Sequence, residues 1–166
     1  CITMNDNWGY CAKDKNFKPA EMIVKKLVEC VSKNGNMLLN VGPDAKGNIP
    51  AESVEILREI GRWMQKNSES IYGCGGCDLP KPENGRITRS GKTLYYHIME
   101  NSIGGVPLQG VRREAVESIR LVCDGSELRP LENWIVENYP DVVFVEASNT
   151  VHLPDSMDTV IAVRLK

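Results

Sequence analysis

The chain has 166 residues, of which 42% are hydrophobic and 25% are charged, and its formal net charge at pH 7 is −2. This is the composition of an ordinary globular protein, long enough for one medium domain or two small ones. Because there is no basic surplus and no apolar run near the roughly 20 residues of a membrane span, we expect neither a nucleic-acid partner nor a membrane partner.

The first part of the chain predicts a parallel β-α-β unit. Residues 1–5 form a short, mostly apolar run, residues 19–33 have helical spacing, and residues 36–41 form a second, mostly apolar run that ends at Gly42-Pro43. Strand, crossover helix and strand in this order pair in parallel, normally with a right-handed crossover. Ligands bind at the loops that follow the C-terminal ends of such strands. We therefore expect residues 6–10 at the rim of an active site to which this chain contributes only part.

Individual residues refine this unit. Pro19 suits the first turn of the helix, and Gly35 suits its C′ position, where a positive φ is common. The nearly continuous apolar residues 37–41 favour a strand that is covered on both faces. Asn40 interrupts this strand, so its side chain must either bond to backbone or face the site.

A second helix is predicted after the turn-rich residues 43–48. Pro50 opens it, and apolar residues keep helical spacing over residues 54–64. Gly61 lies inside this helix, where glycine costs about 1 kcal/mol relative to alanine. We expect a neighbouring element to approach closely at Gly61 and so compensate.

The second half of the chain changes to an alternating pattern. Residues 74–85 are rich in glycine and proline and indicate a linker. Residues 86–89 and 93–99 flank Ser-Gly-Lys, which predicts a hairpin. Further strands are expected at residues 119–123, 142–145 and 159–165, with one or two short strands around Leu128 and residues 131–136. Short strands separated by turns, with no helix between them, predict an antiparallel β-sandwich.

The hairpin also gathers basic and aromatic residues, which would suit a carbohydrate-binding face. These residues are Arg86, Arg89, Lys92, Tyr95 and Tyr96. Strand alternation sends the two tyrosines to opposite faces, which favours an ordinary solvated hairpin with its aromatics packed inward.

Of the six cysteines, only Cys74 and Cys77 are close in sequence. A zinc site normally needs a second such pair or a Cys/His pair, and His97 and His152 are isolated. Free thiols are favoured, with a local disulfide or a metal as alternatives, and we expect no metal and no cofactor. A redox role is disfavoured, because a reactive pair normally lies at a helix N-terminus and this pair lies in a glycine-rich linker.

Four segments together carry a family resemblance. They are Thr-Met-Asn-Asp-Asn-Trp-Gly-Tyr at residues 3–10, Gly-Asn-Met-Leu-Leu-Asn-Val-Gly-Pro at residues 35–43, Ile-Gly-Arg-Trp at residues 60–63 and Ser-Ile-Tyr-Gly at residues 70–73. In this order and spacing they resemble the end of the catalytic barrel of α-L-fucosidases, glycoside hydrolase family twenty-nine. The rest of the chain resembles the C-terminal β-sandwich of this family more loosely.

The resemblance implies that residues 1–73 are the last two β/α units of a (β/α)8 TIM barrel, residues 74–85 a linker, and residues 86–166 a small antiparallel β-sandwich. The parent protein would be a retaining exo-α-L-fucosidase, which hydrolyses terminal α-linked L-fucose from glycans without a metal. Its partners would be a fucosylated glycan and the rest of the barrel. The residues leave the compartment open, and the family implies a secreted, periplasmic or lysosomal location.

In the family pattern an aromatic at the position of Trp8 lines the sugar pocket, and an indole face suits the C–H face of a sugar. Asp6, Asn7 and Tyr10 are weaker substrate-binding candidates, because each also fits a structural role in the loop. The family's Asp nucleophile and Glu or Asp acid/base lie on earlier barrel strands, and no acid here matches them. We therefore assign no catalytic residue and expect the isolated chain to be inactive, since the reaction needs both carboxylates. The alternative is a non-catalytic module, either carbohydrate-binding or structural.

Overall fold

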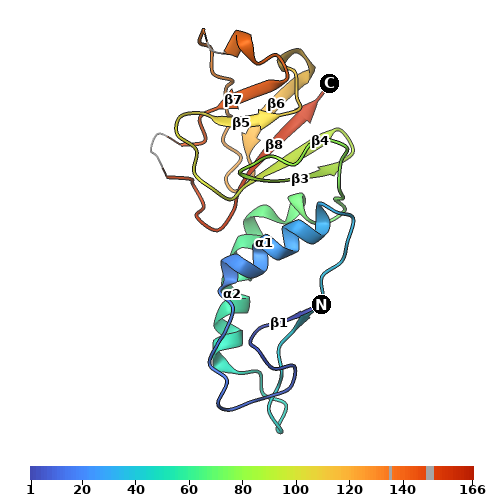
Figure 1. Ribbon diagram of the computed structural model, residues 1–166, viewed down its shortest axis with the longest axis vertical. Helices are drawn as coiled ribbons and strands as arrows, with labels where there is room; N and C mark the ends of the chain where they lie inside the picture. Colours follow the sequence, from blue (N-terminus) through green and yellow to red (C-terminus); the bar gives the residue numbers. More distant parts are fainter. Residues whose placement is uncertain (135, 149–151) are drawn as a thin grey trace.

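The computed structural model describes residues 1–134, 136–148 and 152–166, and it shows three layers (Figure 1). Two helices form the first layer, a four-stranded antiparallel sheet the second, and a two-stranded antiparallel sheet the third. A pair of short parallel strands lies on the side of the helices away from these two sheets. The mixed helix and sheet content agrees with the predicted fold class.

The parallel unit at the start of the chain is confirmed. β1 (Ile2–Thr3) pairs in parallel with β2 (Leu39–Asn40), and α1 (Ala20–Val31) connects them. The predicted cover on both faces of the second strand is not observed. The side chain before it, Leu38, is 66% exposed, and β1 and β2 pair only with each other in the part of the chain that the structure describes.

The ends of α1 differ from the prediction by one residue. Pro19 precedes the helix as its N-cap, with φ −64° and ψ 152°. At the other end the left-handed residue is Asn34, with φ 58°, so the prediction that Gly35 has this conformation is wrong. The Gly35 amide donates to the carbonyl of Cys30 at 2.8 Å, which closes the helix end. Asparagine can take this role because it tolerates left-handed backbone better than most residues.

The second helix, α2 (Ala51–Asn67), begins after Pro50 as predicted and continues into the short helix η1 (Ser68–Ser70). The expected close approach at Gly61 is wrong. A Cβ atom built there would meet no atom within 4 Å in the described chain, so nothing offsets the cost of glycine in this helix. None of the described helices is long and apolar enough to cross a membrane.

The large sheet has the order β3-β4-β8-β6, with every neighbouring pair antiparallel. Its strands are β3 (Gly85–Ser90), β4 (Thr93–Ile98), β6 (Val116–Leu121) and β8 (Thr159–Leu165). The predicted hairpin joins β3 and β4. Its turn is short, with Gly91 at φ 54°.

The small sheet consists of β5 (Val106–Gln109) and β7 (Val142–Val145), paired antiparallel. The first of these strands was not predicted, because Pro107 interrupts its pattern and proline cannot donate to a strand ladder. It is tolerated here because β5 is an edge strand that pairs on one side only.

Two short helices, η2 (Arg113–Ala115) and η3 (Val136–Asn138), complete the elements. Short strands were predicted within residues 131–136, but residues 131–134 are loop and residue 136 begins η3. Residue 135 lies outside the described residues. On either side of Leu128 the structure has isolated bridges, one between Arg120 and Glu127 and one between Pro130 and Val145.

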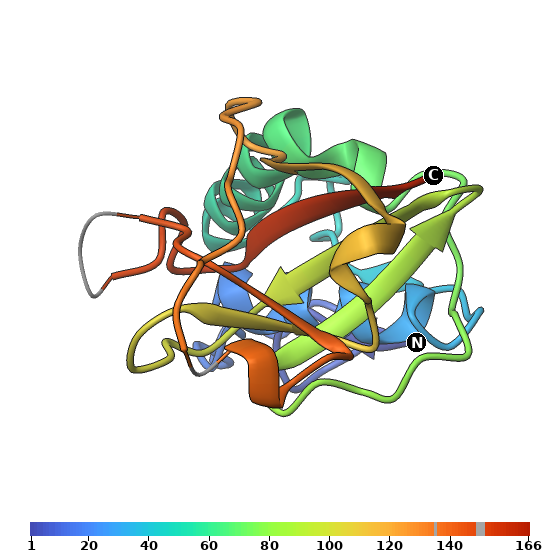
Figure 2. The same ribbon diagram turned by 90° about the horizontal axis from the view of Figure 1, so that it is seen from above.

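Each face of the large sheet covers a separate apolar core. The face toward the small sheet carries Tyr96 and Ile161, and the face toward the helices carries Tyr95 and Val160. Seen from the sheet end, the helices lie beneath the strands (Figure 2). The prediction that strand alternation sends Tyr95 and Tyr96 to opposite faces is confirmed. Because they are only 7% and 0% exposed, the hypothesis that they form a carbohydrate-binding face is wrong.

The predicted linker is bonded to the elements on both sides of it. Gly75 and Arg89 exchange backbone hydrogen bonds of 3.0 and 2.9 Å, and the Gly76 amide donates to Asn34 Oδ1 at 2.8 Å. A Cβ on Gly76 would lie 2.5 Å from the Ser32 carbonyl oxygen, so glycine is needed for this approach. All six cysteines are free thiols, as favoured, and the described residues contain no group of three or more potential metal ligands.

Candidate functional site

The candidate site begins at the C-terminal ends of the two parallel strands. After β1 the chain runs through an irregular loop, residues 5–18, before α1 starts. The Lys18 amide returns to bond the Met4 carbonyl at 2.8 Å, and Lys18 Nζ donates to the Asn5 carbonyl at 2.6 Å. The two ends of the loop are therefore fastened together, and the residues between them, which we call the rim loop, project from the strand end.

Asp14 organises the first half of the rim loop. Its Oδ2 atom accepts hydrogen bonds from the backbone amides of Asp6 and Asn7, at 3.0 and 3.1 Å, and from Asn7 Nδ2 at 2.8 Å. The Asn7 side chain and these amides favour the ionised carboxylate, so they lower the pKa of Asp14. The loop is thus built around one negative charge that the sequence did not single out.

The structure separates the predicted site residues into two kinds. Asp6 and Asn7 are tied into the loop, because Asp6 Oδ2 accepts from Asn16 Nδ2 at 3.0 Å and Asn7 bonds to Asp14. Trp8 and Tyr10 are instead 57% and 54% exposed. The rim loop therefore presents two aromatic side chains at the strand end.

The second strand holds the rim loop from the side. Asn40 Nδ2 donates to the carbonyl of Trp8 at 2.7 Å and to Thr3 Oγ1 at 3.1 Å. Of the two predicted roles for Asn40, the structure has the bond to backbone. The acceptor is the carbonyl oxygen of Trp8, the first of the predicted substrate-binding residues.

A cavity of about 290 Å³ opens between the rim loop and the start of α2 and includes Tyr10 in its lining. Two of its carboxylates are held ionised. Lys15 Nζ lies 2.8 Å from Glu52 Oε1 and lowers the pKa of Glu52, and the Asn48 backbone amide lowers the pKa of Asp44. A general acid of a glycosidase needs the opposite, a raised carboxyl pKa. These acids therefore suit a structural role.

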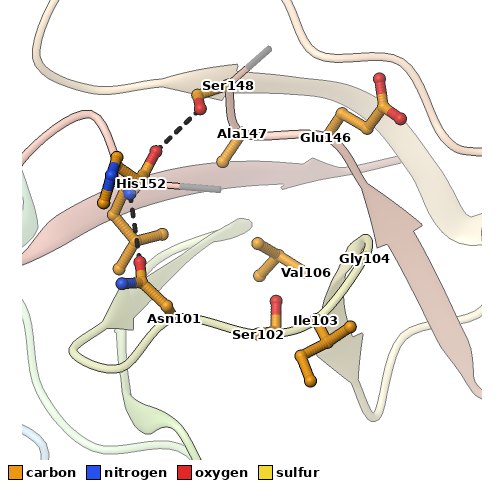
Figure 3. A pocket seen from close by; sticks show the side chains of 10 residues that line it. Asn101, Ser102, Ile103, Gly104, Val106, Glu146, Ala147, Ser148 and His152 are labelled. Atoms are coloured by element: carbon orange, nitrogen blue, oxygen red, sulfur yellow. Dashed lines mark hydrogen bonds between the residues drawn. The ribbon is translucent and has the colours of Figure 1, made fainter. Parts of the chain in front are cut away.

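A larger cavity, of about 720 Å³, lies near the small sheet (Figure 3). Two of its polar side chains bond to backbone. Asn101 Oδ1 accepts from the Leu153 amide at 3.1 Å, and Ser148 Oγ donates to the His152 carbonyl at 2.8 Å. The cavity borders residues 149–151, which lie outside the described residues, and we assign it no site.

A threonine, a histidine and an aspartate also meet, but inside the protein. His97 Nδ1 lies 2.7 Å from Asp158 Oδ2, and His97 Nε2 lies 3.1 Å from Thr88 Oγ1. The Thr88 hydroxyl donates to the Ser70 carbonyl at 2.7 Å, and Trp63 Nε1 donates to the Asp158 carbonyl at 3.0 Å. The three side chains are fully buried, so no substrate reaches them. They connect the helical layer to the large sheet.

Solved structures share this fold along the whole chain. α-L-Fucosidase isoenzyme 1 from Paenibacillus thiaminolyticus is 50% identical with a TM-score of 0.94, over 100% of this chain and 39% of that chain. The α-L-fucosidase from Vibrio sp. strain EJY3 is 27% identical with a TM-score of 0.80, over 99% of this chain and 29% of that chain. Both of these similar structures are of glycoside hydrolases.

Sequence comparison gives the family. Residues 1–69 match the family model described as Alpha-L-fucosidase. The α-L-fucosidase of Dictyostelium discoideum is 44% identical over 75 residues, and the tissue α-L-fucosidase of Mus musculus is 40% identical over 106 residues. The chain belongs to the α-L-fucosidase family. It spans 16% and 22% of the length of these two relatives, and they align with 44% and 61% of this chain.

Proposed function

We propose that this chain is the C-terminal part of a retaining exo-α-L-fucosidase, which releases terminal α-linked L-fucose from glycans. The observation that carries the proposal is the parallel β1–β2 pair with an aromatic rim loop at its C-terminal end, within the residues that match the family. A Thermotoga maritima α-fucosidase, 25% identical with a TM-score of 0.78, is known in complex with fucose. A covalent intermediate has been trapped on the Bacteroides thetaiotaomicron enzyme, which supports a retaining mechanism.

In this proposal residues 1–73 are the last two β/α units of a (β/α)8 barrel, joined by residues 74–85 to a β-sandwich of residues 86–166. Unpaired strand edges are a liability that a closed barrel removes. β1 and β2 pair only with each other in the described chain, and Leu38 beside them is exposed. Further barrel strands on either side would satisfy both edges and cover this side chain.

Trp8 is the residue that we assign to the sugar. Its indole would pack against the C–H face and methyl group of fucose, and Tyr10 would line the neighbouring cavity. Asp6 and Asn7 would act through the shape of the rim loop, because their side chains are already engaged with Asn16 and Asp14.

The two catalytic carboxylates would come from the rest of the barrel. A retaining enzyme needs them about 5–5.5 Å apart, one as nucleophile and one as acid/base. Near the rim loop, Asp14, Asp44 and Glu52 have lowered pKa values and hydrogen-bonding partners, which suits neither a general acid nor a free nucleophile. We therefore expect no turnover by this chain alone.

The test is release of 4-nitrophenol from 4-nitrophenyl-α-L-fucoside. The chain alone should release none, and the complete enzyme that contains it should turn over. Trp8→Ala in the complete enzyme should lower kcat/KM by about tenfold or more, since it removes the aromatic platform. Trp134→Ala is the matched control, because Trp134 is 79% exposed and lies in the β-sheet region. Turnover by the isolated chain, or full activity of the Trp8 variant, would contradict the proposal.

A further inference from the structure

The rim loop touches the neighbouring strand at the backbone of Trp8. Asn40, the last residue of β2, places its amide group between two oxygens, at 2.7 Å from the Trp8 carbonyl and 3.1 Å from Thr3 Oγ1. An asparagine amide has two N–H donors, so both oxygens can be satisfied at once. Thr3 Oγ1 also lies 3.1 Å from the Asn7 carbonyl. The peptide groups on both sides of Trp8 are therefore held from the strand ends.

A second contact reinforces the first. Gly42 has φ +53°, and a Cβ atom built on it would lie 3.3 Å from the Trp8 carbonyl oxygen and from the backbone of Gly9. Only a residue without a side chain both adopts this conformation easily and allows the rim loop so close. The strand end thus meets the Trp8–Gly9 backbone through one hydrogen bond and one close packing contact.

We propose that Asn40 is a positioning residue for the sugar platform, holding the Trp8 backbone so that the indole is presented at the mouth of the site. This inference rests on the proposed function, in which Trp8 binds fucose. Asn40 does not itself touch the sugar. Its chemistry is specific, because a carboxylate of the same shape has no hydrogen to donate and would oppose the Trp8 carbonyl with negative charge.

Kinetics of the complete enzyme give the first test. Asn40→Asp should lower kcat/KM for 4-nitrophenyl-α-L-fucoside by about 3- to 10-fold, mainly through KM, the range expected for loss of a hydrogen bond that orders a binding group. In a Trp8→Ala background the same change should have almost no further effect, because Asn40 acts through Trp8. Asn101→Asp is the matched control: its Oδ1 accepts from the Leu153 amide far along the chain, and a carboxylate can do the same.

The second readout observes the indole directly. In the complete enzyme labelled with 5-fluorotryptophan, the ¹⁹F signal lost in Trp8→Phe identifies that residue. The signals lost in Trp63→Phe and Trp134→Phe identify the other two tryptophans of this chain. Asn40→Asp should shift the Trp8 signal and leave those of Trp63 and Trp134 in place. A variant that only loosens the fold would move the buried Trp63 as well.

The positioning role of Asn40 and the sugar-binding role of Trp8 can fail independently in these experiments. If Trp8→Ala leaves kcat/KM unchanged, the proposed role of Trp8 fails. If Trp8→Ala is impaired but Asn40→Asp is not, or if the two changes are additive, the positioning role of Asn40 is overturned while the fucosidase proposal stands. An unmoved Trp8 ¹⁹F signal in Asn40→Asp would also overturn it.

Discussion

A buried proton between His97 and Asp158 should make the stability of this protein depend on pH. The Thr88 hydroxyl has one hydrogen, and it is donated to the Ser70 carbonyl at 2.7 Å. The 3.1 Å contact between Thr88 Oγ1 and His97 Nε2 therefore requires a proton on Nε2. A further proton must then lie in the 2.7 Å contact between Nδ1 and Asp158 Oδ2. Consistent with this, burial raises the pKa of Asp158.

Proton linkage gives the direction and the size of the change in the free energy of unfolding with pH. The folded pair holds two protons, one on Nε2 and one in the contact with Asp158. The unfolded chain, whose carboxyl is ionised above its usual pKa of 3.8, also holds two on the imidazolium below the ordinary histidine pKa of about 6.5, and only one above it. The stabilising contribution of the buried proton is therefore fully present below about pH 6.5 and is lost as the pH rises above that value. For one proton the free energy of unfolding falls by at most about 1.4 kcal/mol per pH unit. His97 and Lys25 oppose the rise of this pKa, and Asp155 adds to it.

Other acids act in a different pH range. The pKa of Glu29 is lowered to about 2, chiefly by its hydrogen bond with Lys33, and that of Asp14 is also lowered. The stability that they contribute is lost only as the pH falls below the ordinary carboxyl range. The interval from about pH 6.5 to 8 therefore isolates the buried pair.

Asp158→Asn is the informative variant. In the described part of the chain Asp158 Oδ1 is buried without a hydrogen-bond partner, so an amide there leaves an N–H or a carbonyl unpaired. The expected loss at pH 5 is about 1–3 kcal/mol. Urea unfolding from about pH 6.5 to 8 should show stability that falls with pH in the parent chain and is nearly constant in the variant. Asp124→Asn, in an exposed turn, should keep the parent slope. Equal slopes for Asp158→Asn and the parent would refute the shared proton.

Three further substitutions test the packing, each by urea unfolding at pH 7. Gly61→Ala should raise the free energy of unfolding by about 1 kcal/mol, because the new methyl meets no atom within 4 Å; a loss would show that the site is not open. Gly42→Ala should lower it by about 1–2 kcal/mol, because its φ is +53°; an unchanged value would contradict the left-handed conformation. Trp63→Phe should lower it by at least about 1 kcal/mol, because the Asp158 carbonyl loses its indole donor; an unchanged value would show that this bond contributes nothing.

Regular strands were predicted closely because their signal is local. Residues 142–145 and 159–165 have the β-branched, apolar composition of strands, and the structure has β7 and β8 at these same bounds. β5 was missed because Pro107 breaks the local pattern, and only its place at a sheet edge makes proline acceptable. The left-handed residue after α1 was misplaced for a similar reason, since glycine is the stronger local signal and Asn34 has the conformation.

The contacts that shape the rim loop could not be predicted from its residues alone. The resemblance pointed to Trp8, but nothing in the residues around Asp14 distinguishes this carboxylate from its charged neighbours. Its role depends on contacts with residues seven and eight positions away, in a segment without periodic structure. His97 and Asp158 are 61 positions apart and meet only through the tertiary fold. Such contacts carry no sequence pattern that a single chain reveals.

The shared core gives the β-sheet region a part in holding the rim loop. Helices of the length of α1 are marginal alone in water and depend on packing of one apolar face. Val24 and Val28 of α1 and Trp63 of α2 pack in one core with Tyr95 and Val160 of the large sheet. The rim loop leads directly into α1, and β2, which carries Asn40, follows it. The large sheet therefore helps to fix the helix that connects the two strands, and so it supports the site without contributing a residue to it.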